Sequence, residues 1–495
     1  MLDKTTALHL SNRLGFGPAP GDLARIADAG LDNYIQAQLH PQTASLPHNV
    51  TSMLRSLPSF GKDTGALYAE YWWRAQVPDP KALAPEEKKK LKRREKQVLR
   101  EAQNARLARA IISPWQLHEA LVEFWFNHFN VYEKKGADKI WVGAYEEEAI
   151  RPHTLGRFSD MLLATARHPA MLVYLDNAKN VAPAAAGKAD EMNSDADPKK
   201  KKKKKESGIN ENYAREVMEL HTLGVDGGYT QGDVISLAHI LTGWTVGSGG
   251  EADAADAAKL YKRDKGSFHF ARRKHDPAQE TLLGRSFGGE DVNEGEQALL
   301  MLAAHPATAH HISYQLAQYF VADKPDGPLV EAMAKTFRTS GGDIRAVMGT
   351  MLTNPAFLAS SNVGTKYKTP YRYVVSAARA AGIAPDNRTV AALSRALMDL
   401  GQPLYGCITP DGYACTQTAW LDPDGLLHRI SFATELGNGA YSGYASNGDL
   451  DPPDPDRIAE AVGPALSKQT RAAIEATQRG SRAGAILGSP DFMRC

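Results

Sequence analysis

The sequence predicts a large, mainly α-helical protein, either a helical bundle or a toroid of helical hairpins with a small β-hairpin insertion. Apolar residues recur with the 3.6-residue period of a helix over most of the 495 residues. N-cap, capping-box and C′ glycine signals separate these periodic stretches. Short alternating pieces are confined to residues 244–290, which are rich in glycine and charge. We therefore expect one mainly helical domain, residues 1–495, with residues 244–290 as its small β-containing insertion.

The predicted helices follow one another along the chain. Residues 20–40 predict two short helices that break at Gly30, and residues 86–109 predict a charged, solvated helix. Ser113, Pro114 and Gln116 suit the N-cap, N1 and N3 positions of an aromatic-rich helix. Two or three more helices fit residues 138–177. After about residue 294 the helical period returns, at residues 295–304, 306–320, 327–338, 343–352, 370–382, 388–400, 418–436 and 455–478.

Composition excludes some classes of protein. The net charge of +1 gives no support to a nucleic-acid partner, and no apolar run is long enough for a membrane span. Residues 182–208, which include seven consecutive lysines at 199–205, predict a flexible loop. The N-terminus lacks a signal-peptide pattern, so the chain is either cytoplasmic or without its leader. Cys407 and Cys415 can pair if the protein is exported, or remain free thiols, and the compartment stays open.

The most informative segment is residues 210–233. As a helix over 210–222, it places Asn212, Arg215, Glu216 and Glu219 on one face. A glycine at 224 suits the C′ position, and a threonine and an aspartate at 230 and 233 suit a capping box. Helix packing and capping do not account for Glu216, Glu219 and His221, so these residues are candidates for catalysis or binding.

The aromatic-rich helix carries a second polar stripe, formed by Glu119, Glu123, Asn127 and Asn130. A carboxylate buried among aromatic side chains either gains a raised pKa, which suits a general acid, or pairs with an arginine. Residues 151 and 215 supply such arginines. His128 is either a core residue bonded to a carbonyl or a proton carrier.

Two mechanisms follow from these residues. A protonated and an ionised carboxylate can cleave a glycosidic bond. Alternatively, a divalent metal can bind the carboxylate and imidazole ligands Glu119, His128, Glu216, Glu219 and His221. Neither is marked by a known motif: no HExxH, CxxC, GxSxG, P-loop or GxGxxG pattern stands in a credible context. A third cluster, His269, His275 and Asp276, fits an anion pocket or an exposed turn.

Several segments resemble the bacterial DUF1800 family in collinear order over nearly the whole chain. They include FWFNHFNV at residues 124–131, HPAMLVYLDN at 168–177, NENYAREVMELHTLGVDGGYTQGDV at 210–234 and LGQPLYG at 400–406. The resemblance implies no assigned activity. Many members resemble exported proteins and lie beside genes for sulfatase-like proteins, which implies glycan metabolism and a periplasmic or exported location. Phe126 stands where members often have a polar residue or histidine, and this favours carboxylate over metal catalysis.

We therefore expect a hydrolase acting on a polysaccharide or other glycan, without a cofactor, in which Glu216 or Glu219 works with Glu119 as the acid/base pair. The residues expected to bind substrate are Arg215, Asn212, His221, Tyr229, Trp125, Trp244 and His128. The alternative is a non-catalytic helical scaffold that binds or matures a sulfatase-like partner, and a metal-dependent enzyme is third. An enzyme needs the carboxylates beside an open cavity, whereas a scaffold needs them paired and closed off.

Overall fold

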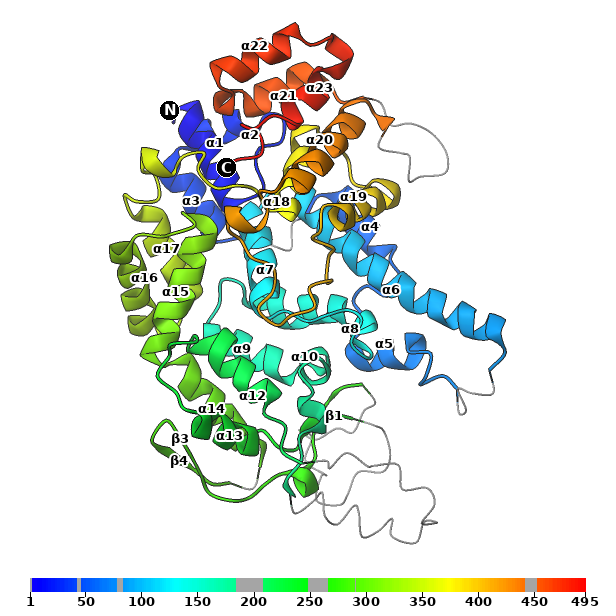
Figure 1. Ribbon diagram of the computed structural model, residues 1–495, viewed down its shortest axis with the longest axis vertical. Coiled ribbons are helices and arrows are strands. Elements are labelled where there is room, and N and C mark those ends of the chain that lie inside the picture. Colours follow the sequence, from blue (N-terminus) through cyan, green and yellow to red (C-terminus); the bar gives the residue numbers. More distant parts are fainter. Residues whose placement is uncertain are drawn as a thin grey trace.

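The computed structural model describes residues 2–41, 46–77, 83–183, 208–247, 266–289, 291–440 and 452–495. Helices dominate these residues and surround the central helix α7 (Gln116–His128), which confirms the predicted mainly α fold class (Figure 1). The N-terminal helices and the last helices lie side by side at one end of the molecule. Before α7 come α1 (Lys4–Leu14), α2 (Asp22–Ala29), α3 (Leu31–Leu39), α4 (His48–Arg55), α5 (Thr64–Tyr71) and α6 (Pro85–Ile112).

The remaining helices continue this arrangement around α7. The middle of the chain forms α8 (Asp138–Tyr145), the π-helix η1 (Glu146–Ile150), α9 (Phe158–Arg167), α10 (Pro169–Tyr174), α12 (Asn212–Glu216), the π-helix η5 (Val217–Thr222), α13 (Gln231–Ile240) and α14 (Val292–Ala303). The last part forms α15 (Pro306–Phe320), α16 (Gly327–Thr339), α17 (Ile344–Thr353), α18 (Pro370–Ala380), α19 (Asn387–Asp399), α20 (Pro423–Gly437), α21 (Pro455–Val462), α22 (Lys468–Ala476) and α23 (Arg479–Leu487). The predicted helix at 455–478 is in fact two, because Pro464 interrupts it.

The β structure is small and lies within the predicted insertion. Strand β1 (Trp244–Val246) pairs antiparallel with β2 (Phe268–Phe270), and β3 (Glu280–Leu282) pairs antiparallel with β4 (Arg285–Phe287). Residues 248–265 of this insertion, and nearly all of the predicted lysine-rich loop at 182–208, lie outside the described residues. Within the part of the chain that is described, no helix has the length and apolarity to cross a membrane.

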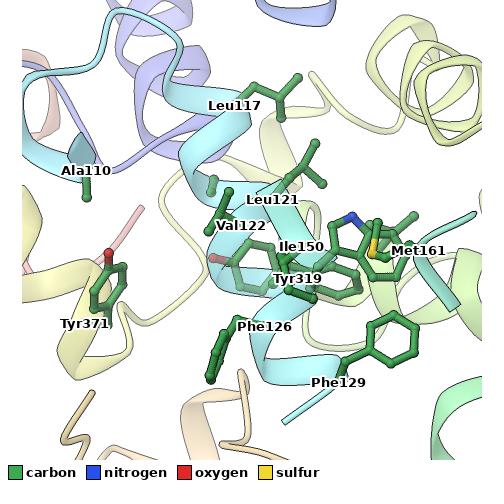
Figure 2. Close-up of a cluster of buried hydrophobic side chains, with 14 of the residues drawn as sticks. Ala110, Leu117, Leu121, Val122, Phe126, Phe129, Ile150, Met161, Tyr319 and Tyr371 are labelled. Atoms are coloured by element: carbon green, nitrogen blue, oxygen red, sulfur yellow. The ribbon is translucent and has the colours of Figure 1, made fainter. Parts of the chain in front are cut away.

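Helix α7 is buried on all sides, so it forms the centre of the core (Figure 2). Leu117, Leu121 and Trp125 have no exposed surface, and the rings of Phe124 and Phe129 pack against Trp125. At roughly 25 cal/mol for each Å² of apolar surface removed from water, such side chains each contribute about 1.5–3 kcal/mol. The polar side chains of α7 must therefore find partners inside the protein.

The start of α7 differs from the prediction. Helix α6 continues to Ile112, and Ser113 is its C-cap rather than the N-cap of α7. The side-chain amide of Gln116 donates to the carbonyl oxygens of Ala110 (3.0 Å) and Ser113 (2.8 Å). These are carbonyls that the end of α6 leaves without intrahelical partners. Gln116 therefore joins the two helices instead of forming a capping box.

The segment at 210–222 is helical as predicted, but its second half is a π-helix. The Leu223 amide donates to the Met218 carbonyl (2.9 Å), five residues back, and the Thr222 hydroxyl donates to the Val217 carbonyl (2.6 Å). The wider turn changes the angular positions of the side chains that an α-helical period predicts. Gly224, at φ +85°, ends the segment as the predicted C′ glycine. The predicted Thr230 capping box is also present.

Candidate functional site

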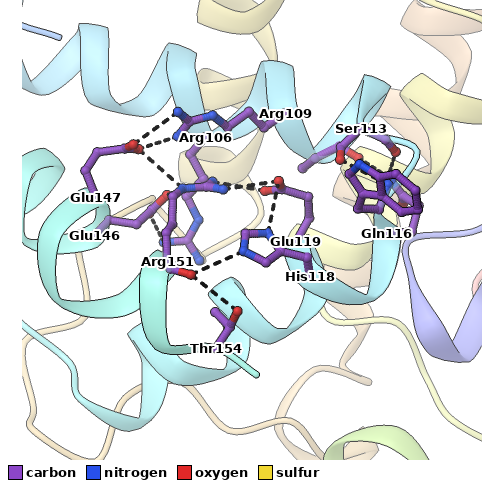
Figure 3. Close-up of polar contacts among 12 residues, drawn as sticks. Arg106, Arg109, Ser113, Gln116, His118, Glu119, Glu146, Glu147, Arg151 and Thr154 are labelled. Carbon is purple, nitrogen blue, oxygen red and sulfur yellow. Dashed lines mark hydrogen bonds and ion pairs between the residues drawn. The ribbon is translucent and has the colours of Figure 1, made fainter. Parts of the chain in front are cut away.

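Glu119 lies in a buried network of ion pairs at the N-terminal end of α7 (Figure 3). Arg151 donates to both carboxylate oxygens of Glu119, at 3.1 and 2.9 Å, and also pairs with Glu146 at 2.9 Å. Burial alone would raise the pKa of Glu119, but the charge of Arg151 holds that pKa well below its ordinary value. The ion-pair alternative therefore describes Glu119, and an ionised, paired carboxylate is unsuited to act as a general acid.

The other members of the predicted polar stripe are also paired. The Tyr319 hydroxyl hydrogen-bonds to the carboxylate of Glu123. The side-chain amide of Asn127 donates to the Tyr413 carbonyl at 2.8 Å and accepts from the Tyr413 amide at 2.7 Å. Asn130 donates to carbonyl oxygens of the same loop, at Cys407 and Thr409. Asn127 and Asn130 thus hold the loop at Cys407, Thr409 and Tyr413 against the end of α7.

Gly412 makes this attachment possible. It adopts φ +71°, and a Cβ atom there would lie 2.4 Å from the backbone oxygen of Asn127. The close approach brings the neighbouring Asp411 and Tyr413 to the end of α7. The two cysteines that flank this part of the loop, Cys407 and Cys415, are free thiols.

We expect Gly412→Ala to destabilise the protein by about 1–3 kcal/mol for the left-handed backbone, and by more for the contact with Asn127. Gly364→Ala is the matched control, because Gly364 has a similar φ of +68° and nothing within 4 Å of its Cβ position. Thermal unfolding midpoints of the two variants separate the effect of the contact from that of the backbone. Equal midpoints would contradict the proposed role of Gly412.

Three histidines surround the end of the π-helix η5. Nε2 of His128 lies 3.1 Å from the His221 carbonyl oxygen, and Nε2 of His311 lies 3.1 Å from that of Leu220. The last carbonyls of a helix have no intrahelical partner, so the two imidazoles satisfy them. His221 itself is buried, and its Nε2 has no hydrogen-bond partner. These contacts place His221 in the core, whereas His128, although buried, also lines a cavity.

The histidines predict acid sensitivity. Burial lowers the pKa of His128 to about 3, whereas an unfolded chain has a histidine pKa of about 6.5. Between these values only the unfolded chain binds the proton, so stability falls as pH drops below about 6.5, by about 1.4 kcal/mol per pH unit for each such histidine.

We expect His128→Gln to reduce the loss of stability between pH 7 and 5, measured by urea unfolding. His310→Gln, at a half-exposed side chain, serves as the control. If the unfolding free energies of the wild type and His128→Gln changed equally with pH, the result would contradict the role of His128 in acid sensitivity.

Glu216 and Glu219 differ from Glu119 because they remain partly exposed. Burial raises the pKa of Glu216, and the charge of the neighbouring Glu219 raises it further. The charge of Asp411 also raises this pKa, whereas Arg215 lowers it. Burial raises the pKa of Tyr229, and the charge of Glu219 raises it further. Glu216, Glu219 and Asp411 therefore form a group of carboxylates in which Glu216 is favoured to hold a proton.

A polar cavity of about 170 Å³ lies beside this group, between α7, η5, α15 and residues 411–415. Asp411 lines the cavity and is also an electrostatic neighbour of Glu216, whereas Glu216 and Glu219 are not among the lining residues. The remaining lining residues are Phe124, Asn127, His128, Leu220, Gln315, Gln318, Tyr319, Tyr413, Ala414 and Cys415. Amide, hydroxyl and carboxylate groups of this kind suit a ligand rich in hydroxyls.

Two predicted substrate-binding residues on the same helix have structural partners. One guanidinium nitrogen of Arg215 donates to Glu211 (2.8 Å) and to Gln231 (2.9 Å), and Gln231 donates to Glu211 in turn. The side-chain amide of Asn212 donates to the Leu175 carbonyl (3.1 Å). Arg215 thus joins α12 to α13, and Asn212 joins α12 to the end of α10.

The two tryptophans predicted to stack on sugars are buried, and this prediction is wrong. Trp125 has no exposed surface, and its indole N–H donates to the Thr154 carbonyl (3.2 Å). Trp244 is equally buried and packs so closely on Gly295 that a Cβ there would lie 2.7 Å from its ring. Both rings are therefore core residues, and neither presents a surface to a ligand.

The third predicted cluster is divided among separate partners. His275 Nε2 lies 3.2 Å from a carboxylate oxygen of Glu294, whereas Asp276 pairs with His239 at 2.7 Å. His269 pairs across the sheet with Thr245. Among the described residues, no group of three or more His, Cys, Asp or Glu side chains is arranged to hold a metal ion.

The sequence did not reveal Asp411, Gln315 or Tyr413. Asp411 precedes a glycine in a loop, where aspartate usually signals only a turn. Gln315 lies on α15, about 190 residues from α7, so only the fold brings it within 2.8 Å of His128. A local signal for these residues is absent, because each joins the site through a long-range contact.

The fold and site define a mainly α protein with a polar, carboxylate-bearing cavity at one end of its central helix. The chain belongs to the DUF1800 family, whose model matches residues 9–494 and is described as "Protein of unknown function (DUF1800)". The curated proteins and the solved structures give no significant match.

Proposed function

We propose that the protein is a hydrolase that cleaves a polysaccharide or other glycan by carboxylate acid/base catalysis, with Glu216 as the general acid. The observation that carries the proposal is the raised pKa of Glu216, whose electrostatic neighbours are Glu219 and Asp411, the latter a lining residue of the polar cavity. A general acid must hold its proton near neutral pH, and a carboxyl group does so only when burial or a neighbouring charge raises its pKa.

In the proposed reaction Glu216 donates its proton to the glycosidic oxygen as the bond to the anomeric carbon breaks. An ionised carboxylate, Asp411 or Glu219, then acts on the other side as the base for water or as the nucleophile. Asp411 replaces Glu119 in this role, because Glu119 is held by Arg151 in a separate network. Tyr229, next to Glu219, and the amides of the cavity would bind sugar hydroxyls.

A screen for reducing ends released from a panel of polysaccharides tests the proposal, with and without EDTA. Release that survives EDTA, and that declines as pH rises through the raised pKa of Glu216, would support it. Release that EDTA abolishes would instead favour a metal-dependent enzyme. Absence of release from the whole panel would count against hydrolysis.

A non-catalytic scaffold for a sulfatase-like partner is the second candidate. The observation that favours it is the pairing of Glu119, Asn127 and Asn130, all of which are engaged inside the protein. Size-exclusion chromatography with a purified sulfatase-like protein tests this candidate. A stable complex without glycan hydrolysis would favour the scaffold.

A further inference from the structure

A second cavity, of about 340 Å³, lies at the other end of α7. Its walls include Leu46, Arg109, Trp115, His118, Glu147 and Pro152. Glu119, which also lines this cavity, lies nine positions before His128 on the helix, so the two cavities are roughly 13 Å apart along α7. The volume falls within the range of about 300–1,000 Å³ that small-molecule sites occupy.

The polar side of this cavity carries balanced charges. The guanidinium of Arg109 donates to both carboxylate oxygens of Glu147, one of them at 3.0 Å. Arg151 pairs with Glu119 at 2.9 Å and lies 3.3 Å from Glu147 (Figure 3). Two guanidinium groups and two carboxylates therefore line one cavity. A ligand with a net charge would meet a like charge there, so the arrangement favours a neutral polar ligand.

The same groups suit hydroxyls. Each carboxylate has lone pairs beyond those that its arginine uses, and hydrogen bonds to ionised groups are stronger than neutral ones. Glu147 is the most accessible member, with its side chain 28% exposed, whereas the side chain of Arg109 is 10% exposed. A hydroxyl of a bound ligand can therefore reach Glu147 without breaking the deeper pair between Arg151 and Glu119.

Apolar side chains also line this cavity. Trp115 is partly exposed at the start of α7, next to Leu46 and Pro152. An indole ring offers a large flat apolar surface that packs against C–H groups. A sugar ring presents C–H groups on one face and hydroxyls around its edge, so it matches a cavity that combines an aromatic side chain with hydrogen-bonding charges.

We propose that this cavity is a non-catalytic binding site for a neutral sugar ring, with Trp115 against the ring face and Glu147 accepting from its hydroxyls. The site is separate from the carboxylates around Glu216. It requires only binding, so it does not rest on the proposed hydrolysis.

Ligand-observed NMR with the full chain tests this proposal, using methyl β-glucoside, N-acetylglucosamine, cellobiose, glucuronate and glycine as probes. We expect the neutral sugars to bind with Kd values of about 1 mM. Trp115→Ala should weaken binding by about tenfold, since it removes the aromatic wall. Glu147→Gln, at the most accessible charged side chain of the cavity, provides a second variant whose amide oxygen can still accept from Arg109. Trp72→Ala, at a partly buried tryptophan outside the cavity, should leave the affinity unchanged.

Three results would overturn the proposal. The first is that none of the neutral sugars binds to the wild-type protein. The second is that the sugars bind but neither Trp115→Ala nor Glu147→Gln weakens their binding. The same conclusion follows if Glu216→Gln abolishes the binding instead, because that result would place the sugar in the other cavity. The third is that glycine or glucuronate binds here in preference to the neutral sugars. Loss of hydrolysis with retained binding would leave this site intact and would count only against the proposed function.

Discussion

Glu216→Gln is expected to lower the rate of glycan hydrolysis by a factor of about 10²–10⁴, the contribution typical of a general acid. Glutamine has nearly the same shape but no acidic proton, so the glycosidic oxygen would have to leave without protonation. The fold should persist, because Glu216 is only partly buried and no ion pair holds it within the described residues. The measurement is the initial rate of reducing-end release from the best substrate of the panel.

Glu211→Gln is the matched control for this variant. Glu211 lies at the start of the same helix and pairs with Arg215 at 2.8 Å, in an exposed arrangement. Loss of such a pair changes stability by less than about 1 kcal/mol and should not change the rate tenfold. If both variants reduced the rate equally, the general charge of the helix would explain the effect, and Glu216 would lose its assigned role.

Arg151→Met is expected to destabilise the protein by about 3–5 kcal/mol, the largest stability effect that we anticipate. Arg151 pairs with Glu119 and with Glu146, and the side chains of these glutamates are only 5% and 2% exposed. Removal of the guanidinium leaves carboxylates buried with too few partners, and such a charge costs several kcal/mol. Chemical unfolding curves of the wild type and the variant measure the loss.

Two further variants make the Arg151 experiment specific. Adding Glu119→Gln to Arg151→Met should restore part of the stability, because it removes one of the unpaired charges. Arg479→Met breaks a solvent-exposed pair with Asp456 and should cost less than about 1 kcal/mol. A loss for Arg151→Met no greater than that for Arg479→Met would show that the network contributes little.

The fold class could be predicted because it depends on local patterns. The helical period, the Gly224 ending and the Thr230 capping box all involve residues within one or two turns of each other. The π-helix at Val217–Thr222 could not be predicted in this way. Its hydrogen bonds run to the fifth residue back, and the choice between that pattern and an α-helix is set by tertiary contacts, here the histidines that meet its last carbonyls.

The candidate site was only partly predictable, for a related reason. Glu216 and Glu219 stood out because helix architecture left them unexplained, and both remain candidates. Burial, however, is a property of the whole fold. Tryptophan is a residue type typical of sugar-binding surfaces, but Trp125 and Trp244 lie in the core. Asp411 becomes significant only because Asn127 brings its loop to α7.

The double hydrogen bond between Asn127 and the backbone of Tyr413 joins the central helix of the protein to the loop that carries Asp411. Loops at binding sites usually open locally, at a free energy well below that of global unfolding. Here departure of the loop would break both hydrogen bonds of the Asn127 side-chain amide at once. The core and this part of the site therefore form one cooperative unit, in which the shape of the cavity is maintained by the same free energy that keeps the protein folded.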